Sequence, residues 1–244
     1  MSDIDTILNT AVANHDVPFV VAMSANSDSV TYSGAAGEAA AGMDAAESTA
    51  FRIFSMTKAV GSVAAMILID RGKMSMDTPV GDVLPAWNDL QVLEGWDGDT
   101  PKMRAPTTRA TARHLATHTS GMEYEFWNPD VPKYLEVKEH PTILSGLMAS
   151  MSYPLTSDPG TRWGYGPAID WLGRMVEEID GRRIDAFCRE EIFEPLGMSD
   201  TAFEPDALNE RLAGVSIRGE DGQFAPFELA PPPQPEFYGM GHAL

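Results

Sequence analysis

The segment at residues 51–59, FRIFSMTKA, leads into an almost uninterrupted apolar run. Within residues 59–69 the only polar side chain belongs to Ser62. A helix that is apolar on all sides is usually buried on all sides. We therefore expect a helix over residues 55–71 that passes through the centre of the molecule, with Gly72 placed to end it.

Ser55 and Lys58 occupy the start of this expected helix. Side chains three residues apart lie on one helix face, with Cβ atoms about 5–6 Å apart. The free backbone N–H groups at a helix start favour developing negative charge. A serine hydroxyl needs a base to become a good nucleophile, and a lysine that loses hydration on an apolar helix can act as that base. An N-cap serine followed by a lysine that extends to solvent explains the same residues, so Ser-x-x-Lys alone does not distinguish a catalytic pair from a structural one.

Tyr165 stands in a turn between Gly164 and Gly166, ahead of an amphipathic helix expected over residues 167–180. Such a turn can direct the phenol into a cleft. Near a protonated lysine the pKa of a tyrosine falls, so that the phenolate can act as a general base and the phenol as a general acid. An ordinary buried tyrosine at a helix start is the competing interpretation.

On the N-terminal side, the chain predicts one short helix and a β-hairpin. Apolar residues recur at helical spacing over residues 3–14. Residues 18–23 and 30–33 are expected to be strands joined by the polar turn 26–29. The Ala- and Gly-rich run 34–46 is expected to be a loop or an irregular edge. Because a lone hairpin is marginally stable, further strands or a covering helix are needed.

On the C-terminal side, the pattern predicts helices joined by turns and loops. Residues 73–87 are turn-rich, and residues 88–106 are expected to be a loop because they are polar and punctuated by Pro and Gly. Helices are expected over 112–118 with Thr111 as N-cap, near 141–150, over 167–180 with Gly181 after it, and over 184–193.

The composition excludes several classes of function. With 17 Lys and Arg against 36 Asp and Glu, the formal charge is −19, which would repel nucleic acid and anionic lipid. There is no signal-peptide pattern and no membrane-length apolar stretch, so we expect a cytoplasmic protein without nucleic-acid or membrane partners. Cys188 is the only cysteine, and Leu115 stands where a His114–His118 zinc helix would need Glu. We therefore expect no metal and no cofactor.

Four segments in order carry a resemblance to a known family. They are residues 51–59 (FRIFSMTKA), 115–122 (LATHTSGM), 163–173 (WGYGPAIDWLG) and 195–203 (PLGMSDTAF). Together they resemble the serine β-lactamase and penicillin-binding-protein superfamily. The resemblance is closest to its class C-like branch, which includes the family VIII carboxylesterases. With the hairpin before these segments, it covers nearly the whole chain.

This resemblance implies a catalytic mechanism. Ser55 would be acylated, with Lys58 beside it, and Tyr165 would relay protons to the leaving group and later activate water. The backbone N–H of Ser55 would be one donor of the oxyanion hole.

The resemblance also implies a fold, α/β plus all-α. An antiparallel sheet flanked by helices carries an inserted helical domain. Residues 1–75 would form the N-terminal part of the α/β domain with the nucleophile helix, residues 76–205 a mostly helical domain, and residues 206–244 the return toward the α/β domain.

Three departures from the family's pattern bear on function. Pro167 stands where class C β-lactamases have an asparagine, which disfavours β-lactams relative to esters. The family's third motif has no match before Leu244, and its strand supplies the second oxyanion donor; loss of one such donor costs about 2.7–4 kcal/mol of barrier stabilisation. The C-terminal strands are also expected to be lacking, so that a C-terminal remainder or a second fragment would complete the sheet.

We therefore expect a serine hydrolase of small carboxylic esters, acting on a small-molecule ester or amide. One alternative is a β-lactamase or D-amino-acid peptidase of the same superfamily. Another is a non-catalytic acyl-binding or assembly fragment. Candidates for the substrate pocket are the aromatic residues Tyr124, Phe126, Trp127 and Trp163, for which packing within loops is the competing interpretation.

Overall fold

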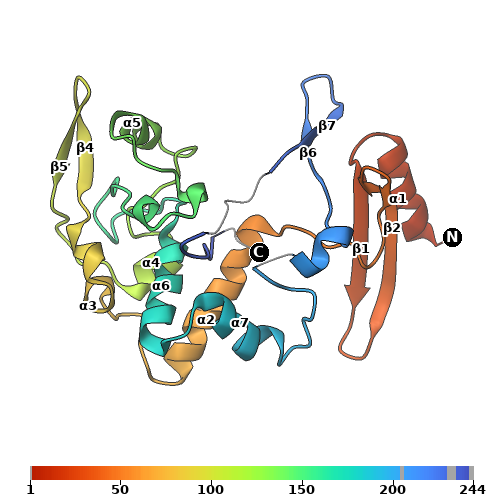
Figure 1. Cartoon of the computed structure of the whole chain (residues 1–244), viewed down its shortest axis with the longest axis horizontal. Coiled ribbons are helices and arrows are strands. Elements are labelled where there is room, and N and C mark those ends of the chain that lie inside the picture. The colour runs from red at the N-terminus through yellow and green to blue at the C-terminus, as the bar shows by residue number, and fades with distance from the viewer. Residues whose placement is uncertain (1, 204–205, 230–234, 242–244) are drawn as a thin grey trace. The chain divides into compact units, whose positions relative to one another are not determined.

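The computed structural model describes residues 2–203, 206–229 and 235–241. The contacts within the chain divide it into two units (Figure 1). The first comprises Met1–Arg52 and Glu204–Pro231, and the second comprises Ile53–Phe203 and Pro232–Leu244. The three proposed catalytic residues all belong to the second unit.

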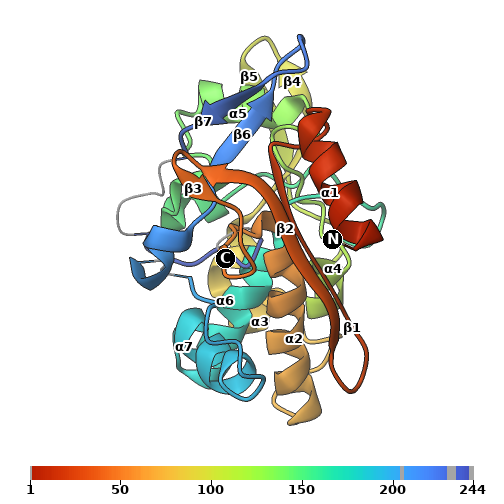
Figure 2. The same ribbon diagram turned by 90° about the vertical axis from the view of Figure 1, so that its right-hand side faces the viewer.

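The first unit begins with helix α1 (Asp3–Ala13) and an antiparallel sheet in the order β1-β2-β3 (Phe19–Ala25, Val30–Ala40 and Met43–Asp44). Helix α1 lies along the hairpin in Figure 2, and Tyr32 Oη donates to Asp5 Oδ1 at 2.8 Å. The predicted helix and hairpin are thus confirmed.

Residues 34–46 were expected to be a loop or an irregular edge; the loop is wrong because most of the segment belongs to the sheet, whereas the pairing of β2 with the edge strand β3 is irregular, with a register shift between Glu38 and Ala40. Strand β2 continues to Ala40 and pairs with β1 from Ala25↔Val30 to Phe19↔Gly37. A Cβ atom on Gly37, whose φ is +87°, would lie 2.6 Å from the Pro18 carbonyl oxygen. Close pairing with β1 therefore needs the small residues that lowered the strand propensity of this run.

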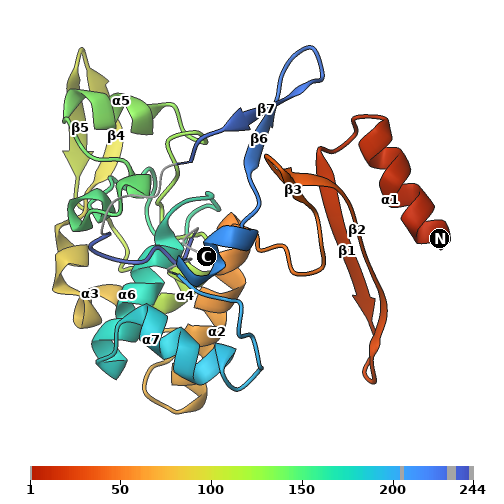
Figure 3. The ribbon, with the colours of Figure 1, turned by 45° about the vertical axis from the view of Figure 1, so that its right-hand side comes forward.

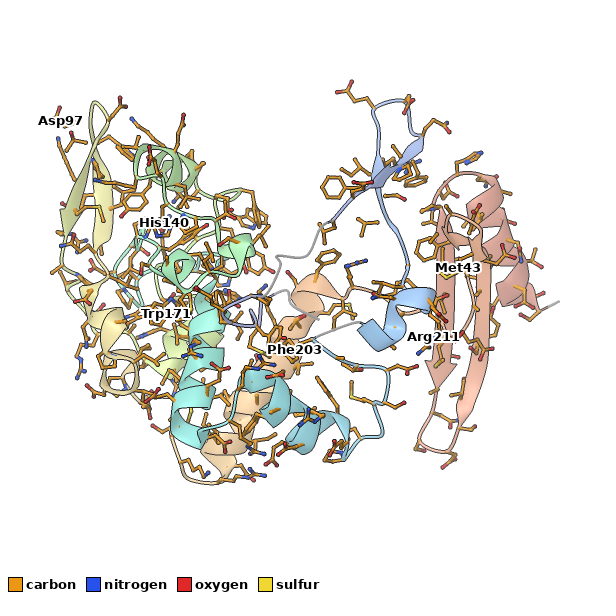
Figure 4. All side chains as sticks on the ribbon, viewed as in Figure 1. Met43, Asp97, His140, Trp171, Phe203 and Arg211 are labelled. Atoms are coloured by element: carbon orange, nitrogen blue, oxygen red, sulfur yellow. The ribbon has the colours of Figure 1, made fainter. Side chains whose placement is uncertain are left out.

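A second hairpin of the first unit consists of β6 (Val215–Arg218) and β7 (Phe224–Phe227). The segment before it is held by backbone hydrogen bonds, from Ala50 N to the Arg211 carbonyl and from Ala213 N to the Ala50 carbonyl, both 2.8 Å. Figure 4 labels Arg211 and Met43 in this unit.

The second unit is built around two long helices. Helix α2 (Thr57–Asp70) follows a 3-10 turn at Phe54–Met56, and helix α6 (Ala168–Asp180) packs alongside it (Figures 1 and 3). As predicted, α6 is amphipathic and is followed by Gly181, whose φ is +88°. The side chain of Trp171, labelled in Figure 4, makes an edge-to-face contact with Trp87 at 5.0 Å.

The prediction that the nucleophile helix is buried on all sides is wrong for α2. Its buried residues include Gly61, Ala64, Ala65 and Leu68, whereas Val63 is 45% exposed and Met66 40% exposed. An apolar composition permits burial of every face, but only packing partners produce it, and α6 covers one face.

Shorter elements complete the second unit. They are α3 (Val80–Val83), a 3-10 turn at Pro85–Asp89, β4 (Val92–Asp97), β5 (Thr100–Arg104), α4 (Ala112–Ala116), α5 (Asp130–Val137), 3-10 turns at Ile143–Ser145 and Met148–Met151, and α7 (Ile184–Cys188), which continues as a π-helical turn at Arg189–Phe193. Thr111 caps α4 as predicted. The helix predicted near 141–150 is instead two 3-10 turns, interrupted at Gly146 with a φ of +69°.

The loop predicted over residues 88–106 is wrong, since it contains the β4–β5 hairpin, with Asp97 at its tip in Figure 4. Arg104 binds both oxygens of Asp158 at 2.8 and 2.9 Å and also binds Glu94. These contacts with a distant segment stabilise strands that local propensity does not favour. No helix in the described residues is long and apolar enough to cross a membrane.

The side chain of Met240 packs between α2 and α6. Its side chain is fully buried, and Cβ atoms on Gly61 and Gly173 would lie 2.8 and 2.5 Å from its Cβ and Cγ atoms. Two glycines, one on each helix, therefore make the space that Met240 occupies.

Met240→Ala is expected to lower the free energy of unfolding by about 2–5 kcal/mol, because it leaves a cavity between the helices. Gly173→Ala should destabilise the wild type but cost less in the Met240→Ala background, where its methyl group has room. Urea denaturation of both single variants and the double variant measures this coupling. Strict additivity of the two effects would contradict the packing of Met240 on Gly173.

Candidate active site

Ser55 lies in the 3-10 turn that leads into α2, and its side chain is exposed. The residue before it, Phe54, has a φ of +43°, a left-handed conformation that side chains larger than glycine rarely adopt. The strained turn presents Ser55 at the start of the helix, where backbone N–H groups are not used within the helix. This position agrees with the predicted oxyanion role of the Ser55 N–H, which stays a prediction.

Lys58 is one helical turn further and contacts Ser55. Its Nζ donates to Ser55 Oγ at 3.2 Å, to the Gly241 carbonyl oxygen at 2.8 Å and to Tyr124 Oη at 3.4 Å. An ammonium group has three N–H donors. The three acceptors therefore match a protonated lysine and hold its charge beside the serine oxygen.

Tyr165 contacts the same serine oxygen. Its Oη donates to Ser55 Oγ at 2.8 Å, and Lys58 Nζ lies 4.7 Å from the centre of its ring. Burial raises the pKa of Tyr165, but hydrogen bonding with Lys58 and Ser55 and the Lys58 charge lower it more, so the pKa lies below its ordinary value. The site therefore favours the phenolate form more than water does.

The glycines beside Tyr165 permit close packing of its turn. A Cβ atom on Gly166 would lie 2.2 Å from the Met122 carbonyl oxygen, and one on Gly164 would lie 2.3 Å from Glu123 Oε1. The Tyr165 carbonyl also accepts a hydrogen bond from Tyr124 N at 3.0 Å. The glycine-flanked turn thus fixes the backbone that carries the phenol.

The four aromatic pocket candidates gather around Tyr165. Ring centroids of Tyr124, Trp127 and Trp163 lie 5.3, 6.1 and 6.4 Å from that of Tyr165, and Phe126 stacks on Tyr124 at 5.0 Å. Phe126, Trp127 and Trp163 are 67%, 62% and 64% exposed, whereas Tyr124 is only 4% exposed. Three of the candidates can therefore meet a ligand at the surface, while Tyr124 packs beneath them against Lys58.

His118 is a further group at this site, considered from the sequence only as a zinc ligand together with His114. Its ring centroid lies 5.0 Å from that of Tyr165, and its φ is +55°. Burial, assisted by the charge of Lys58, lowers the pKa of His118 to about 4. At neutral pH the imidazole is therefore uncharged and adds no positive charge beside Tyr165.

Gly241 and Asp170 also belong to the surroundings of Lys58. Gly241 supplies a backbone carbonyl, for which a sequence contains no side-chain signal. Asp170 lies in the first turn of α6, and its Oδ1 accepts from Gly241 N at 2.7 Å. Within the described residues, no group of three or more His, Cys, Asp or Glu side chains could hold a metal ion.

The comparison with protein families supplies the assignment. The model of the Beta-lactamase family matches residues 4–241. The chain belongs to the Beta-lactamase family. This membership confirms the superfamily resemblance and the β-lactamase-like fold.

Among the relatives of this Beta-lactamase family member are acyltransferases and an esterase. It is 33% identical over 181 residues to acyltransferase mokF of Monascus pilosus, covering 72% of this chain and 44% of that protein. It is 34% identical over 157 residues to the lovastatin esterase of Penicillium rubens, covering 62% and 39%. The chain thus spans less than half the length of these curated relatives.

A solved structure agrees with the fold. The LovD6 mutant of simvastatin synthase from Aspergillus terreus superimposes with a TM-score of 0.87 at 27% identity, over 98% of this chain and 62% of that protein.

Proposed function

We propose that this protein hydrolyses small carboxylic esters through an acyl ester on Ser55. The observation that carries the proposal is the double contact at Ser55 Oγ, with Tyr165 Oη at 2.8 Å and Lys58 Nζ at 3.2 Å. One oxygen is thus contacted both by a phenol with a lowered pKa and by the ammonium of Lys58, an arrangement that can activate a serine.

The proposed acylation begins with Tyr165 as a phenolate. The phenolate takes the proton of Ser55 Oγ as that oxygen attacks the ester carbonyl carbon. The ammonium of Lys58 stabilises the negative charge on Tyr165 and Ser55. When the tetrahedral intermediate collapses, the C–O bond to the alcohol breaks, and Tyr165 gives its proton to the departing oxygen.

Deacylation repeats these steps with water as the nucleophile. Tyr165 takes a proton from water as the water oxygen attacks the acyl carbon, then returns a proton to Ser55 Oγ. The reaction releases a carboxylic acid and restores the free serine. No step needs an oxidant, a metal ion or a cofactor.

Esters are favoured over β-lactams by the residue that follows the tyrosine turn. Pro167 forms the N-cap of α6 and has no side-chain amide to contact the amide of a β-lactam. The exposed rings of Phe126, Trp127 and Trp163 offer apolar contact area instead. These features support an ester with an apolar acyl or alcohol portion as substrate.

Transfer of the acyl group to an alcohol is a second candidate function. It is favoured by the similarity to acyltransferase mokF of Monascus pilosus. The chemistry differs only in the second nucleophile, since an alcohol takes the place of water at the acyl-serine.

Kinetics with p-nitrophenyl butyrate test the proposal in the full-length protein. We expect continuous release of p-nitrophenol and much slower turnover of nitrocefin, a β-lactam. Addition of a primary alcohol, with products identified by mass spectrometry, separates hydrolysis from transfer. A single stoichiometric burst without turnover would instead favour the acyl-binding alternative, and faster turnover of nitrocefin would favour the β-lactamase alternative.

A further inference from the structure

A buried carboxyl group is connected to Lys58 through one backbone residue. Asp170 lies in the first turn of α6 and is 1% exposed. Its Oδ1 accepts from Gly241 N at 2.7 Å, and the carbonyl oxygen of Gly241 accepts from Lys58 Nζ at 2.8 Å. Two hydrogen bonds therefore join Asp170 to the lysine that contacts Ser55.

Gly241 fits closely into this connection. A Cβ atom at this position would lie 2.8 Å from Tyr124 Oη and 3.2 Å from Asp170 Oδ1. The absence of a side chain lets the backbone approach both groups. The hydrogen bond that Gly241 N donates to Asp170 Oδ1 then restrains the residue whose carbonyl oxygen accepts from Lys58.

Burial of the Asp170 carboxyl group lowers the stability of the folded protein, so stability alone does not explain its presence. Burial raises the pKa of Asp170 to about 7, although the Gly241 N–H and the Lys58 charge act against this rise. Its Oδ2 atom is buried and has no hydrogen-bond partner among the described residues. A buried carboxyl group that is only half satisfied costs free energy that an apolar residue of similar size would not.

We propose that Asp170 is a positioning residue for the acyl transfer proposed above. It holds the Gly241 carbonyl against Lys58, so that the ammonium stays in contact with Ser55 Oγ and the Tyr165 ring. Asp170 itself does not touch these reacting groups, and it acts only through Gly241. The inference rests on the proposed function and adds a residue to it.

The test compares Asp170→Ala with Asp170→Asn in the full-length protein. Asparagine keeps a carbonyl oxygen for the Gly241 N–H, whereas alanine removes the acceptor. With p-nitrophenyl butyrate, we expect Asp170→Ala to lower kcat by about 10- to 100-fold, the effect of losing a hydrogen bond that involves a charged group. KM should stay within about twofold, and Asp170→Asn should retain kcat within about threefold.

Glu177→Ala is the matched control. Glu177 is a second buried carboxylate on α6, and its Oε1 accepts from Ile184 N at 2.7 Å. It lies seven residues, or about two turns, beyond Asp170. Glu177→Ala should lower the melting temperature but leave kcat unchanged. If Glu177→Ala lowers kcat as much as Asp170→Ala does, the loss reflects lowered stability and contradicts the proposal.

Two further outcomes separate this inference from the proposed function. If a fluorophosphonate does not label Ser55 in the wild type, both fall. If the wild type is labelled and Asp170→Ala is labelled at the same rate, only the positioning role is overturned. The positioning role is also overturned if kcat of Asp170→Asn is as low as that of Asp170→Ala. If Asp170→Ala does not fold, Asp170→Leu replaces it, because leucine fills the side-chain volume but offers no acceptor for Gly241 N. The same fall in kcat, about 10- to 100-fold, is then expected.

Discussion

Ser55→Ala is expected to remove ester turnover almost completely, with kcat lower on the order of 10⁴- to 10⁶-fold. Lys58 Nζ and Tyr165 Oη both contact Ser55 Oγ, so its removal leaves the two proposed proton-transfer groups without the proposed nucleophile. The measurement is p-nitrophenyl butyrate hydrolysis together with intact-protein mass spectrometry after incubation with a fluorophosphonate. The wild type should gain one adduct, and peptide mapping should place it on Ser55.

Ser62→Ala is the matched control for this prediction. Ser62 lies two turns along the same helix, where its Oγ donates to the Lys58 carbonyl oxygen at 2.8 Å. This variant should keep both the adduct and the turnover. An adduct that persists in Ser55→Ala would move the nucleophile to another residue and remove the proposed mechanism.

Tyr165→Phe is expected to lower kcat by about 10²- to 10⁴-fold while KM for the ester changes little. The ring remains, with its contacts to Trp127 and Trp163, so apolar binding should be kept and only the oxygen proposed to transfer protons is lost. In the wild type kcat should rise with pH as the phenolate forms. Because the pKa of Tyr165 is lowered, the rise should come at a lower pH than an ordinary tyrosine would give.

The pH profile of Tyr165→Phe should lack that rise. Tyr134→Phe, on helix α5, removes a hydroxyl from another part of the unit and should leave both kcat and its pH dependence unchanged. Near-normal turnover in Tyr165→Phe would exclude Tyr165 as the proton-transferring group.

Elements with local boundaries could be predicted from the sequence. Helix α6 has a regular apolar face, Pro167 before it and Gly181 after it, and all of these signals lie within the helix and its ends. The β4–β5 hairpin could not be predicted, because its Arg104 is held by Asp158, 54 residues away. Strand β2 was missed for a related reason, since pairing with β1 outweighs the low strand propensity of Ala and Gly.

The candidate site divides in the same way. The contact between Ser55 and Lys58 follows from their spacing on one helical turn. The contact between Ser55 and Tyr165 joins positions 110 residues apart, and only the family resemblance predicted it. The Gly241 acceptor and the positioning role proposed for Asp170 could not be predicted, because a backbone carbonyl has no residue-type signal and Asp170 alone resembles an ordinary helix-start acid.

The hydrogen bond from Lys58 to Gly241 also bears on biosynthesis, since the two residues are 183 positions apart. At about 5–20 residues per second, the ribosome adds Gly241 roughly 10–40 s after Lys58. Contacts between residues so distant in sequence form late in folding. During that delay a nascent chain already contains Ser55 and Lys58, but its lysine does not yet have the carbonyl acceptor that holds it in place. Under the proposed function, the serine site is therefore fully assembled only after residue 241 has left the ribosome, and shorter nascent chains are expected to be acylated more slowly on Ser55.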